Sequence, residues 1–147
     1  MIVEQISVFI ENKEGRLSAI ADLIAKNDID ISALSLADTD EYGVIRMIVS
    51  DPYKAKNILL ENGIIGKVTD VLAIAIEDKP GGFAKALKVL TDRGIEIKYM
   101  YACVAHDSNK AIMIVRVDNA EEVNKILAEN GVDVDSPSSI YRISSKN

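Results

Sequence analysis

The stretch ENKEGRL at residues 11–17 is repeated 66 positions later as EDKPGGF at residues 77–83. The apolar positions after the first copy return at the same offset: Leu17, Ile20, Ala21 and Ile24 correspond to Phe83, Ala86, Leu87 and Leu90. After two further insertions of one residue each, the Asn-Gly pair at residues 62–63 is repeated at residues 130–131. A repeat of this length is too long for a solenoid and matches one small domain. The sequence therefore predicts two domains of the same fold.

The length of the chain, 147 residues, fits two very small domains. A domain of about 65 residues buries only about 60% of the surface of its unfolded chain and is marginally stable alone. Two fused copies share an interface, which gives a physical reason for the duplication. We place the first domain at residues 1–70 and the second at residues 71–147.

Composition and charge exclude several classes of protein. Apolar residues make up 48% of the chain and charged residues 27%, an ordinary globular balance. The net charge of −6, with no basic run, disfavours binding to a nucleic-acid backbone. The longest apolar stretch, residues 71–76, is too short to cross a bilayer, and the N-terminus shows no signal peptide. We therefore expect a cytoplasmic protein that binds neither nucleic acid nor membrane.

Each copy is expected to fold in the order β-α-β-β-α, followed by a closing strand. In the first copy, strand patterns cover residues 5–10, 29–36 and 44–49, and an apolar stripe predicts a helix over residues 15–26. In the second copy, the matching strands cover residues 71–76, 95–104 and 111–117. This order predicts an α+β fold, with antiparallel sheets and both helices on one face of each sheet.

The closing strands allow two arrangements. Residues 64–68 and 132–134 can each close their own copy. Alternatively, the C-terminal segment at residues 139–143 returns to complete the first domain, because an apolar terminal strand needs a sheet edge. We expect the second arrangement. The strands at residues 71–76 and 111–115 are apolar on both faces, so we also expect the twin domain or a second chain to cover the face without helices.

The turns that lead into the first helix of each copy carry the only repeated polar signal. A helix N-terminus presents backbone N–H groups and a partial positive charge, which suit a carboxylate. Gly15 and its counterparts Gly81 and Gly82 have no side chain that would keep a ligand from this backbone. The alternative is that these residues are simply turns and helix caps.

These turns resemble the ACT domain, the small ligand-binding regulatory module of amino-acid metabolism. Residues 12–17 and 78–83 look like the D/N-x-P-G-x-L/F turn of that family, and residues 27–31 and 93–97 resemble the Gly-Ile-Asn-Ile stretch that begins its second strand. The resemblance occurs in both copies and so covers nearly the whole chain. The chain as a whole is similar to the regulatory half of aspartate kinase. It implies ferredoxin-like βαββαβ domains that pair side by side, with amino acids bound where the first turn of one domain meets the second strand of its neighbour.

Carried over to this sequence, the resemblance implies an amino-acid-binding site in each copy. In the first copy the site comprises Asn12, Glu14, Gly15, Arg16, Leu17, Asp30, Ile31 and Ser32. In the second copy it comprises Asp78, Pro80, Gly81, Gly82, Phe83, Glu96, Ile97 and Lys98. Backbone N–H groups would bind the ligand carboxylate, and Asp30 or Asp78 its ammonium group. Because Glu14 replaces the usual proline, we expect two unequal sites.

No catalytic or metal-binding pattern competes with this interpretation. The sequence contains no Cys-x-x-C motif, no repeated Ser/His/Asp set and no Gly-rich phosphate loop. We therefore expect a non-catalytic, allosteric regulator without metal or cofactor, acting as a homodimer on a partner enzyme of amino-acid metabolism. The alternatives are a structural or assembly module without a ligand and a small enzyme on the same scaffold.

Overall fold

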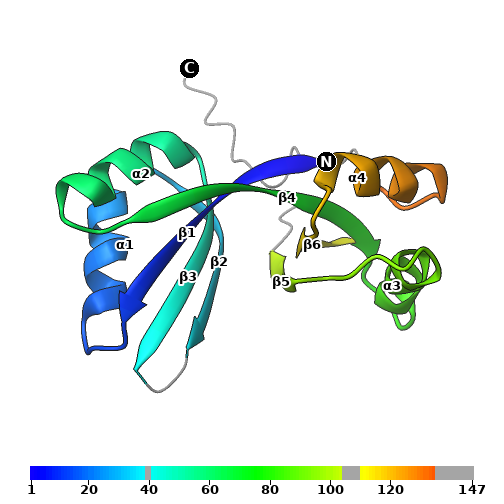
Figure 1. Cartoon of the computed structure of the whole chain (residues 1–147), viewed down its shortest axis with the longest axis horizontal. Helices are drawn as coiled ribbons and strands as arrows, with labels where there is room; N and C mark the ends of the chain where they lie inside the picture. The colour runs from blue at the N-terminus through cyan, green and yellow to red at the C-terminus, as the bar shows by residue number, and fades with distance from the viewer. Residues whose placement is uncertain (39–40, 104–109, 135–147) are drawn as a thin grey trace. The chain divides into compact units, whose positions relative to one another are not determined.

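The computed structural model describes residues 1–38, 41–103 and 110–134 (Figure 1). The chain divides into two compact units. The N-terminal unit is Glu4–Thr69, and the C-terminal unit combines Met1–Val3 with the chain from Asp70 onward. The unit boundaries therefore fall inside two strands, the first strand and the fourth.

The N-terminal unit follows the order β-α-β-β-α-β. Its elements are β1 (Ile2–Glu11, of which Glu4–Glu11 belong here), α1 (Arg16–Lys26), β2 (Ile31–Asp38), β3 (Tyr42–Val49), α2 (Pro52–Glu61) and the first residues of β4 (Gly66–Glu77). The strands lie in the order β2-β3-β1-β4, and both β1 and β2 are antiparallel to β3. Helices α1 and α2 lie on one face of these strands (Figure 1).

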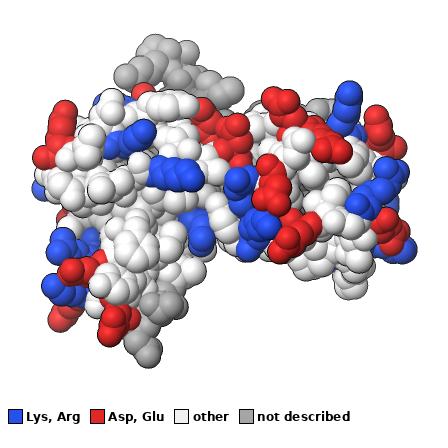
Figure 2. All heavy atoms as spheres, in the orientation of Figure 1, with Lys and Arg blue, Asp and Glu red and all other residues white. Residues whose placement is uncertain are grey.

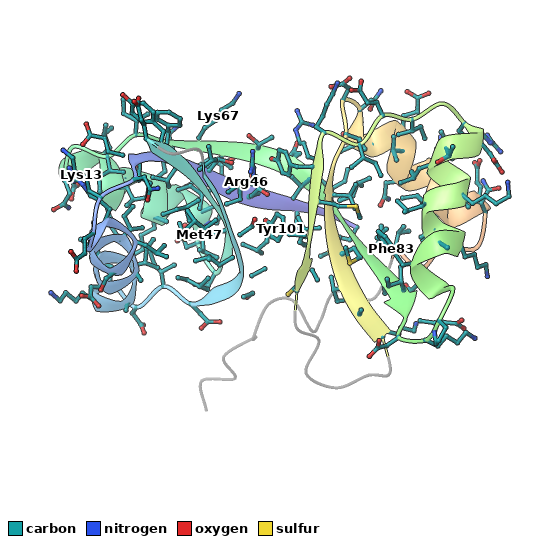
Figure 3. All side chains as sticks on the ribbon, turned by 90° about the horizontal axis from the view of Figure 1, so that it is seen from below. Lys13, Arg46, Met47, Lys67, Phe83 and Tyr101 are labelled. Carbon is teal, nitrogen blue, oxygen red and sulfur yellow. The ribbon has the colours of Figure 1, made fainter. Side chains whose placement is uncertain are left out.

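The core of the N-terminal unit forms between that sheet face and the two helices. Alternate residues of a strand point to opposite faces, so Met47 of β3 is buried among the helices, whereas its neighbour Arg46 lies on the other face (Figure 3). Ile20 of α1 and Leu59 of α2 are almost fully buried in the same cluster. The apolar stripe predicted for the first helix therefore faces the core.

The C-terminal unit repeats this arrangement with α3 (Gly82–Asp92), β5 (Tyr99–Cys103), β6 (Lys110–Arg116) and α4 (Ala120–Glu129). Its strands lie in the order β1-β4-β6-β5, where β1 contributes only its first residues. Both β4 and β5 are antiparallel to β6. Leu72, Leu90 and Leu127 are buried in one cluster between the strands and the helices. The predicted α+β fold, with helices on one face of antiparallel strands, is confirmed.

Two short segments occupy the closing position of the C-terminal unit, beside β4. The backbone nitrogen of Met1 donates to the Ala73 carbonyl at 3.0 Å, and the Ala73 N–H donates to the Met1 carbonyl at 2.8 Å. This reciprocal exchange is the pattern of an antiparallel pair. Further along β4, the Ala75 N–H donates to the Asp133 carbonyl at 2.9 Å. The segment at residues 139–143, which we expected to return to the first domain, lies outside the described residues.

All four described helices end in the same hydrogen-bonded turn, and this turn explains why β2 and β5 begin later than the sequence pattern indicated. After α3, Gly94 takes a left-handed conformation, and the Ile95 N–H donates to the Leu90 carbonyl at 3.0 Å. This is the Schellman motif of helix ends. Since residue 95 still belongs to the helix end, β5 begins at Tyr99 rather than at residue 95, where the sequence pattern placed it.

Surface charges contribute little to holding these units together. Figure 2 shows acidic and basic side chains interspersed on the visible face of each unit. Lys88 and Asp92, one turn apart on α3, form an exposed ion pair at 2.9 Å, and such pairs contribute about 0.3–0.5 kcal/mol. The stability of each unit therefore comes from its apolar core. No helix in the described part of the chain is long and apolar enough to cross a membrane.

Candidate functional site

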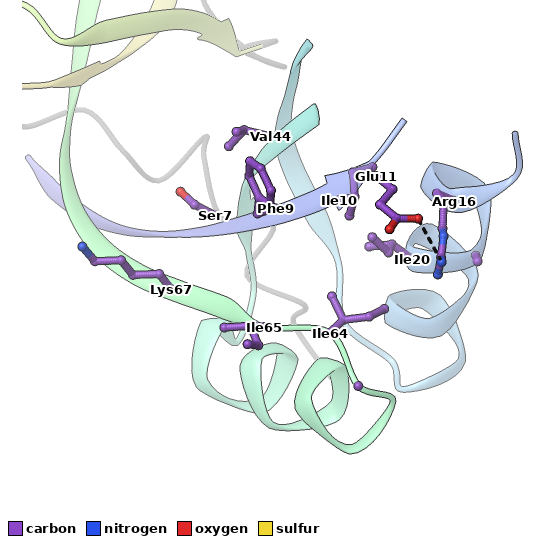
Figure 4. Close-up of a pocket in the computed structure, with 12 residues that line it drawn as sticks. Ser7, Phe9, Ile10, Glu11, Arg16, Ile20, Val44, Ile64, Ile65 and Lys67 are labelled. Atoms are coloured by element: carbon purple, nitrogen blue, oxygen red, sulfur yellow. Dashed lines mark ion pairs between the residues drawn. The ribbon is translucent and has the colours of Figure 1, made fainter. Parts of the chain in front are cut away.

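A pocket of about 570 Å³ opens in the N-terminal unit. It lies where the end of β1 and the start of α1 meet the chain between α2 and β4 (Figure 4). Its volume falls within the range of about 300–1,000 Å³ that is usual for small-molecule sites. The lining residues are Ser7, Phe9, Ile10, Glu11, Arg16, Ala19, Ile20, Val44, Gly63, Ile64, Ile65 and Lys67.

Most of the wall of this N-terminal pocket is apolar. Phe9 of β1 stacks on Tyr42 of β3, with ring centroids 5.2 Å apart and an interplanar angle of 18°. The Phe9 side chain is nevertheless 63% exposed, and Ile65 is 77% exposed. Exposed apolar surface at a pocket favours a ligand that removes it from water. The wall is therefore suited to an apolar group.

One edge of the pocket carries both signs of charge. The Glu11 carboxylate lies 4.0 Å from the Arg16 guanidinium and 2.7 Å from the Lys13 ammonium (Figure 4 draws the first pair). A hydrogen bond from Lys13, together with its charge, lowers the pKa of Glu11, and the charge of Arg16 adds to this effect. The Glu11 carboxylate therefore stays ionised at pH values below those at which a glutamate is usually protonated. An anion and a cation at one edge suit a zwitterion, because each can form a charge-assisted hydrogen bond with the ligand.

The lowered pKa of Glu11 gives a prediction for Lys13→Gln. We expect the pKa of Glu11 in this variant to rise toward its ordinary value, as measured by NMR titration of the carboxyl carbon. A depressed folded-state pKa stabilises the protein above the unfolded-state pKa, and this contribution is lost as the pH falls through the folded-state value. Glu77 is the matched control, since its pKa is lowered in the same way by Lys79 and should not change.

The C-terminal unit has a smaller pocket of about 190 Å³ at the corresponding position. Its lining includes Glu77, which matches Glu11 and keeps an ion pair with Lys79 at 2.6 Å. Across its mouth, the Lys110 ammonium pairs with the Asp133 carboxylate at 2.5 Å. Lys85 also lines this pocket. The same corner of the fold is therefore open in one unit and narrowed by charged side chains in the other.

The backbone geometry of the two turns explains why they contain glycine. Gly15 and Gly81 take left-handed conformations with φ of 80° and 89°, and a Cβ atom on either would meet nothing within 4 Å. A Cβ atom on Gly82 would lie 2.2 Å from the carbonyl oxygen of Glu77. Backbone geometry therefore requires glycine at these positions. We had expected these glycines to leave the helix N-terminus open to a ligand, but their presence is no evidence for one.

This geometry predicts that two alanine substitutions in the second turn destabilise the protein for different reasons. Gly82→Ala forces a side chain against backbone and should destabilise the protein by about 1–3 kcal/mol, the range for overpacking. Gly81→Ala places alanine in a left-handed conformation without a clash and should cost about 1–2 kcal/mol. Urea unfolding of both variants measures the two costs. A Gly82→Ala protein as stable as the wild type would contradict the close approach to Glu77.

Comparison with known families identifies the chain. A family model described as an ACT domain pair matches residues 1–142. The chain belongs to the ACT domain pair family. Protein BT0572 from Bacteroides thetaiotaomicron is 37% identical to it, with a TM-score of 0.87 over 97% of this chain and 98% of that one. The resemblance found in the sequence is confirmed.

More distant solved structures share the fold. The ligand-free regulatory subunit of aspartate kinase from Thermus thermophilus is 14% identical, with a TM-score of 0.63 over 89% of this chain and 97% of that one. The corresponding subunit from Thermus flavus is 13% identical, with a TM-score of 0.57 over 88% and 95%. At these identities the likeness concerns the fold alone. A search of curated proteins found no significant match.

In the first ACT domain, only one of the residues expected to bind the ligand lines the pocket. Arg16 lies in its wall, whereas Leu17 packs against the core. The Asn12 N–H donates to the Glu41 carbonyl at 2.8 Å, and the Arg16 N–H donates to the Lys13 carbonyl at 3.2 Å. This Arg16 N–H is therefore already used within the turn. Glu14 is exposed beside these groups.

The expected second-strand residues lie at the other end of the same sheet. Ile31 is paired with Val49 at the C-terminal end of β3. The turn follows Glu11, which is paired with Tyr42 at the N-terminal end of β3. The two ends of β3 are roughly 23 Å apart at 3.3 Å per residue. Asp30 is held there by its backbone, which accepts from the Ser50 N–H at 2.9 Å, and Ser32 follows in β2. A site that combines this turn with Asp30, Ile31 and Ser32 needs the strand of a neighbouring domain, and it remains a prediction.

The expected residues of the second ACT domain are divided in the same way. Gly82 lines the smaller pocket, and Phe83 at the start of α3 is 40% exposed (Figure 3). Asp78 and Pro80 are exposed in the turn before Gly81. Ile97 packs against the core, while the Lys98 ammonium pairs with Glu96 at 2.9 Å and with Asp118 at 3.3 Å. The two acidic partners raise the pKa of Lys98.

Sequence reasoning did not find the apolar wall of the N-terminal pocket. Phe9, Val44, Ile64 and Ile65 come from three separate segments, and none belongs to the turn motif. One signal was present in the duplication: Phe9 matches Ala75, and Ile65 matches Asp133 across the insertions. A large apolar residue in one copy against a small or charged one in the other marks a difference between the two ACT domains.

Proposed function

We propose that this ACT domain pair binds a small amino acid in the pocket of the N-terminal unit and acts as a non-catalytic regulatory protein. The observation that carries this proposal is the placement of Glu11 and Arg16 at one edge of a largely apolar pocket. Arg16 is positioned for the ligand carboxylate and Glu11 for its ammonium group. The apolar wall then receives the side chain.

The regulatory role is an allosteric one. A ligand that binds one arrangement of the protein better than another shifts the population toward that arrangement. A partner enzyme of amino-acid metabolism would respond to this shift, with the ACT domain pair acting as a homodimer in the cytoplasm. The Thermus proteins with the same fold are regulatory subunits of aspartate kinase, which supports a role of this kind.

A thermal-shift screen against the twenty amino acids tests the proposal. A ligand at 100 times its Kd stabilises the folded protein by about 2.7 kcal/mol. At about 2–4 °C per kcal/mol for a protein of this size, the Tm should rise by several degrees. The absence of a shift with every amino acid would support the alternative of an assembly module without a ligand. A pull-down with and without the stabilising amino acid then tests for the partner enzyme.

A further inference from the structure

The mouths of the two pockets, meaning the residues that line or flank their openings, differ at three matched positions. Strand register defines the match, because Glu11 is paired with Tyr42 in the same way that Glu77 is paired with Lys110. The positions are Phe9, Tyr42 and Ile65 in the N-terminal unit, and Ala75, Lys110 and Asp133 in the C-terminal unit. One mouth is therefore aromatic and aliphatic, and the other is small and charged.

In the N-terminal unit Phe9 and Ile65 line the pocket, and Tyr42, which is not part of this lining, stacks on Phe9 beside it. The Phe9 and Tyr42 rings are stacked, yet they remain 63% and 43% exposed. Ile65 lies before the start of β4 and is 77% exposed (Figure 4). Two stacked rings hold one another in place, so they offer a preformed surface. An apolar ligand side chain that covers this surface gains hydrophobic free energy, whereas a charged one would lose hydration.

In the C-terminal unit the corresponding side chains close the pocket. The Ala75 N–H donates a hydrogen bond to the Asp133 carbonyl at 2.9 Å, and this bond positions Asp133 beside β4. The Asp133 carboxylate forms an ion pair with the Lys110 ammonium across the mouth. The Asp133 side chain is 28% exposed and the Lys110 side chain 41%. A ligand entering here would have to break a partly buried ion pair and leave its charges without partners. The pocket volume of about 190 Å³, against about 570 Å³ in the N-terminal unit, reflects this closure.

We propose that the N-terminal pocket selects α-amino acids with a bulky apolar side chain, leucine and phenylalanine among them, and that the C-terminal pocket binds none. Phe9 and Ile65 determine the selectivity, with the Phe9 ring supported by the stacked Tyr42 ring, and the Lys110–Asp133 ion pair closes the second pocket. This inference rests on the proposed function, since it names the ligand class of the same site. It predicts one ligand per chain.

Isothermal titration calorimetry with leucine, phenylalanine, alanine, lysine and aspartate tests the selectivity. Each methylene lost from an apolar contact costs at least about tenfold, so leucine or phenylalanine should bind at least tenfold more tightly than alanine, with a stoichiometry of one per chain. Tighter binding of lysine or aspartate, or two sites per chain, would overturn the inference while leaving amino-acid binding intact. If none of the twenty amino acids binds, the proposed function fails and this inference fails with it.

The double variant Tyr42→Lys with Ile65→Asp tests the closure. It places the residue types of the C-terminal mouth at the matched N-terminal positions, and leucine binding should weaken at least tenfold. The matched control is Tyr53→Lys with Leu60→Asp, which changes two exposed residues of α2 outside the pocket in the same way and should bind as the wild type does. Circular dichroism confirms that both variants are folded. A folded pocket variant with unchanged leucine affinity would overturn the role of the ion pair.

Discussion

Replacing Arg16 with alanine is expected to weaken amino-acid binding by about 10- to 100-fold and to leave the fold intact. A hydrogen bond to a charged group is worth about 1.5–3 kcal/mol, and each 1.4 kcal/mol corresponds to about tenfold in Kd. The Arg16 side chain is 51% exposed, and its ion pair with Glu11 is long at 4.0 Å. Its loss should therefore change the free energy of unfolding by no more than about 0.5 kcal/mol.

Two further variants separate the charge of Arg16 from its shape. Arg16→Lys keeps the charge but lacks the planar fork that binds a carboxylate through two bonds, so its affinity should lie between those of the wild type and Arg16→Ala. Arg93→Ala removes an exposed arginine at the end of α3 and should bind as the wild type does. Calorimetric Kd values provide the comparison. An Arg16→Ala protein with the affinity of the wild type would mean that another group binds the carboxylate.

The largest effect on stability is expected from truncation of a core leucine. Leu59 of α2 is fully buried in the core of the N-terminal unit, and Leu59→Ala should destabilise the protein by about 2–5 kcal/mol, the cost of a buried leucine and its cavity. The neighbouring Leu60 is 58% exposed, so Leu60→Ala should cost no more than about 0.5 kcal/mol. The midpoint of urea unfolding measures both changes.

The duplication gives this prediction a second test. Leu127 of α4 corresponds to Leu59 and is fully buried in the core of the C-terminal unit. Leu127→Ala should therefore be as destabilising as Leu59→Ala, although it lies in the other unit. Equal and small effects of Leu59→Ala and Leu60→Ala would show that α2 does not bury the face that the structure assigns to it.

Most of the fold could be predicted from the sequence because the chain contains its own comparison. The repeated apolar positions, such as Ile20 with Ala86 and Ile24 with Leu90, identified the buried helix faces. The boundaries of β2 and β5 could not be predicted, since the residues after each helix are apolar but complete a Schellman motif. The pairing of Met1 with Ala73 was also out of reach, because hydrogen bonds between distant backbone groups leave no side-chain pattern.

The candidate site was predicted only in part, for a related reason. The turn motif identified Arg16, which does line the pocket. It could not identify Phe9 and Ile65, because their proximity depends on where β4 begins and on the path of the chain after α2. Nor could it show that Gly82 is required by the carbonyl of Glu77. A motif fixes residue types along the chain, whereas a pocket depends on the space between segments.

The most direct test of the central claim is NMR mapping of the bound ligand. Leucine should be titrated into ¹⁵N-labelled protein while the backbone amide shifts are followed. We predict the largest changes at residues 7–11, 16–20 and 63–67, around the N-terminal pocket, and little change at residues 75–77 and 131–133 in the C-terminal one. Shifts centred on the C-terminal pocket, or equal shifts in both, would contradict a single amino-acid site in the N-terminal unit.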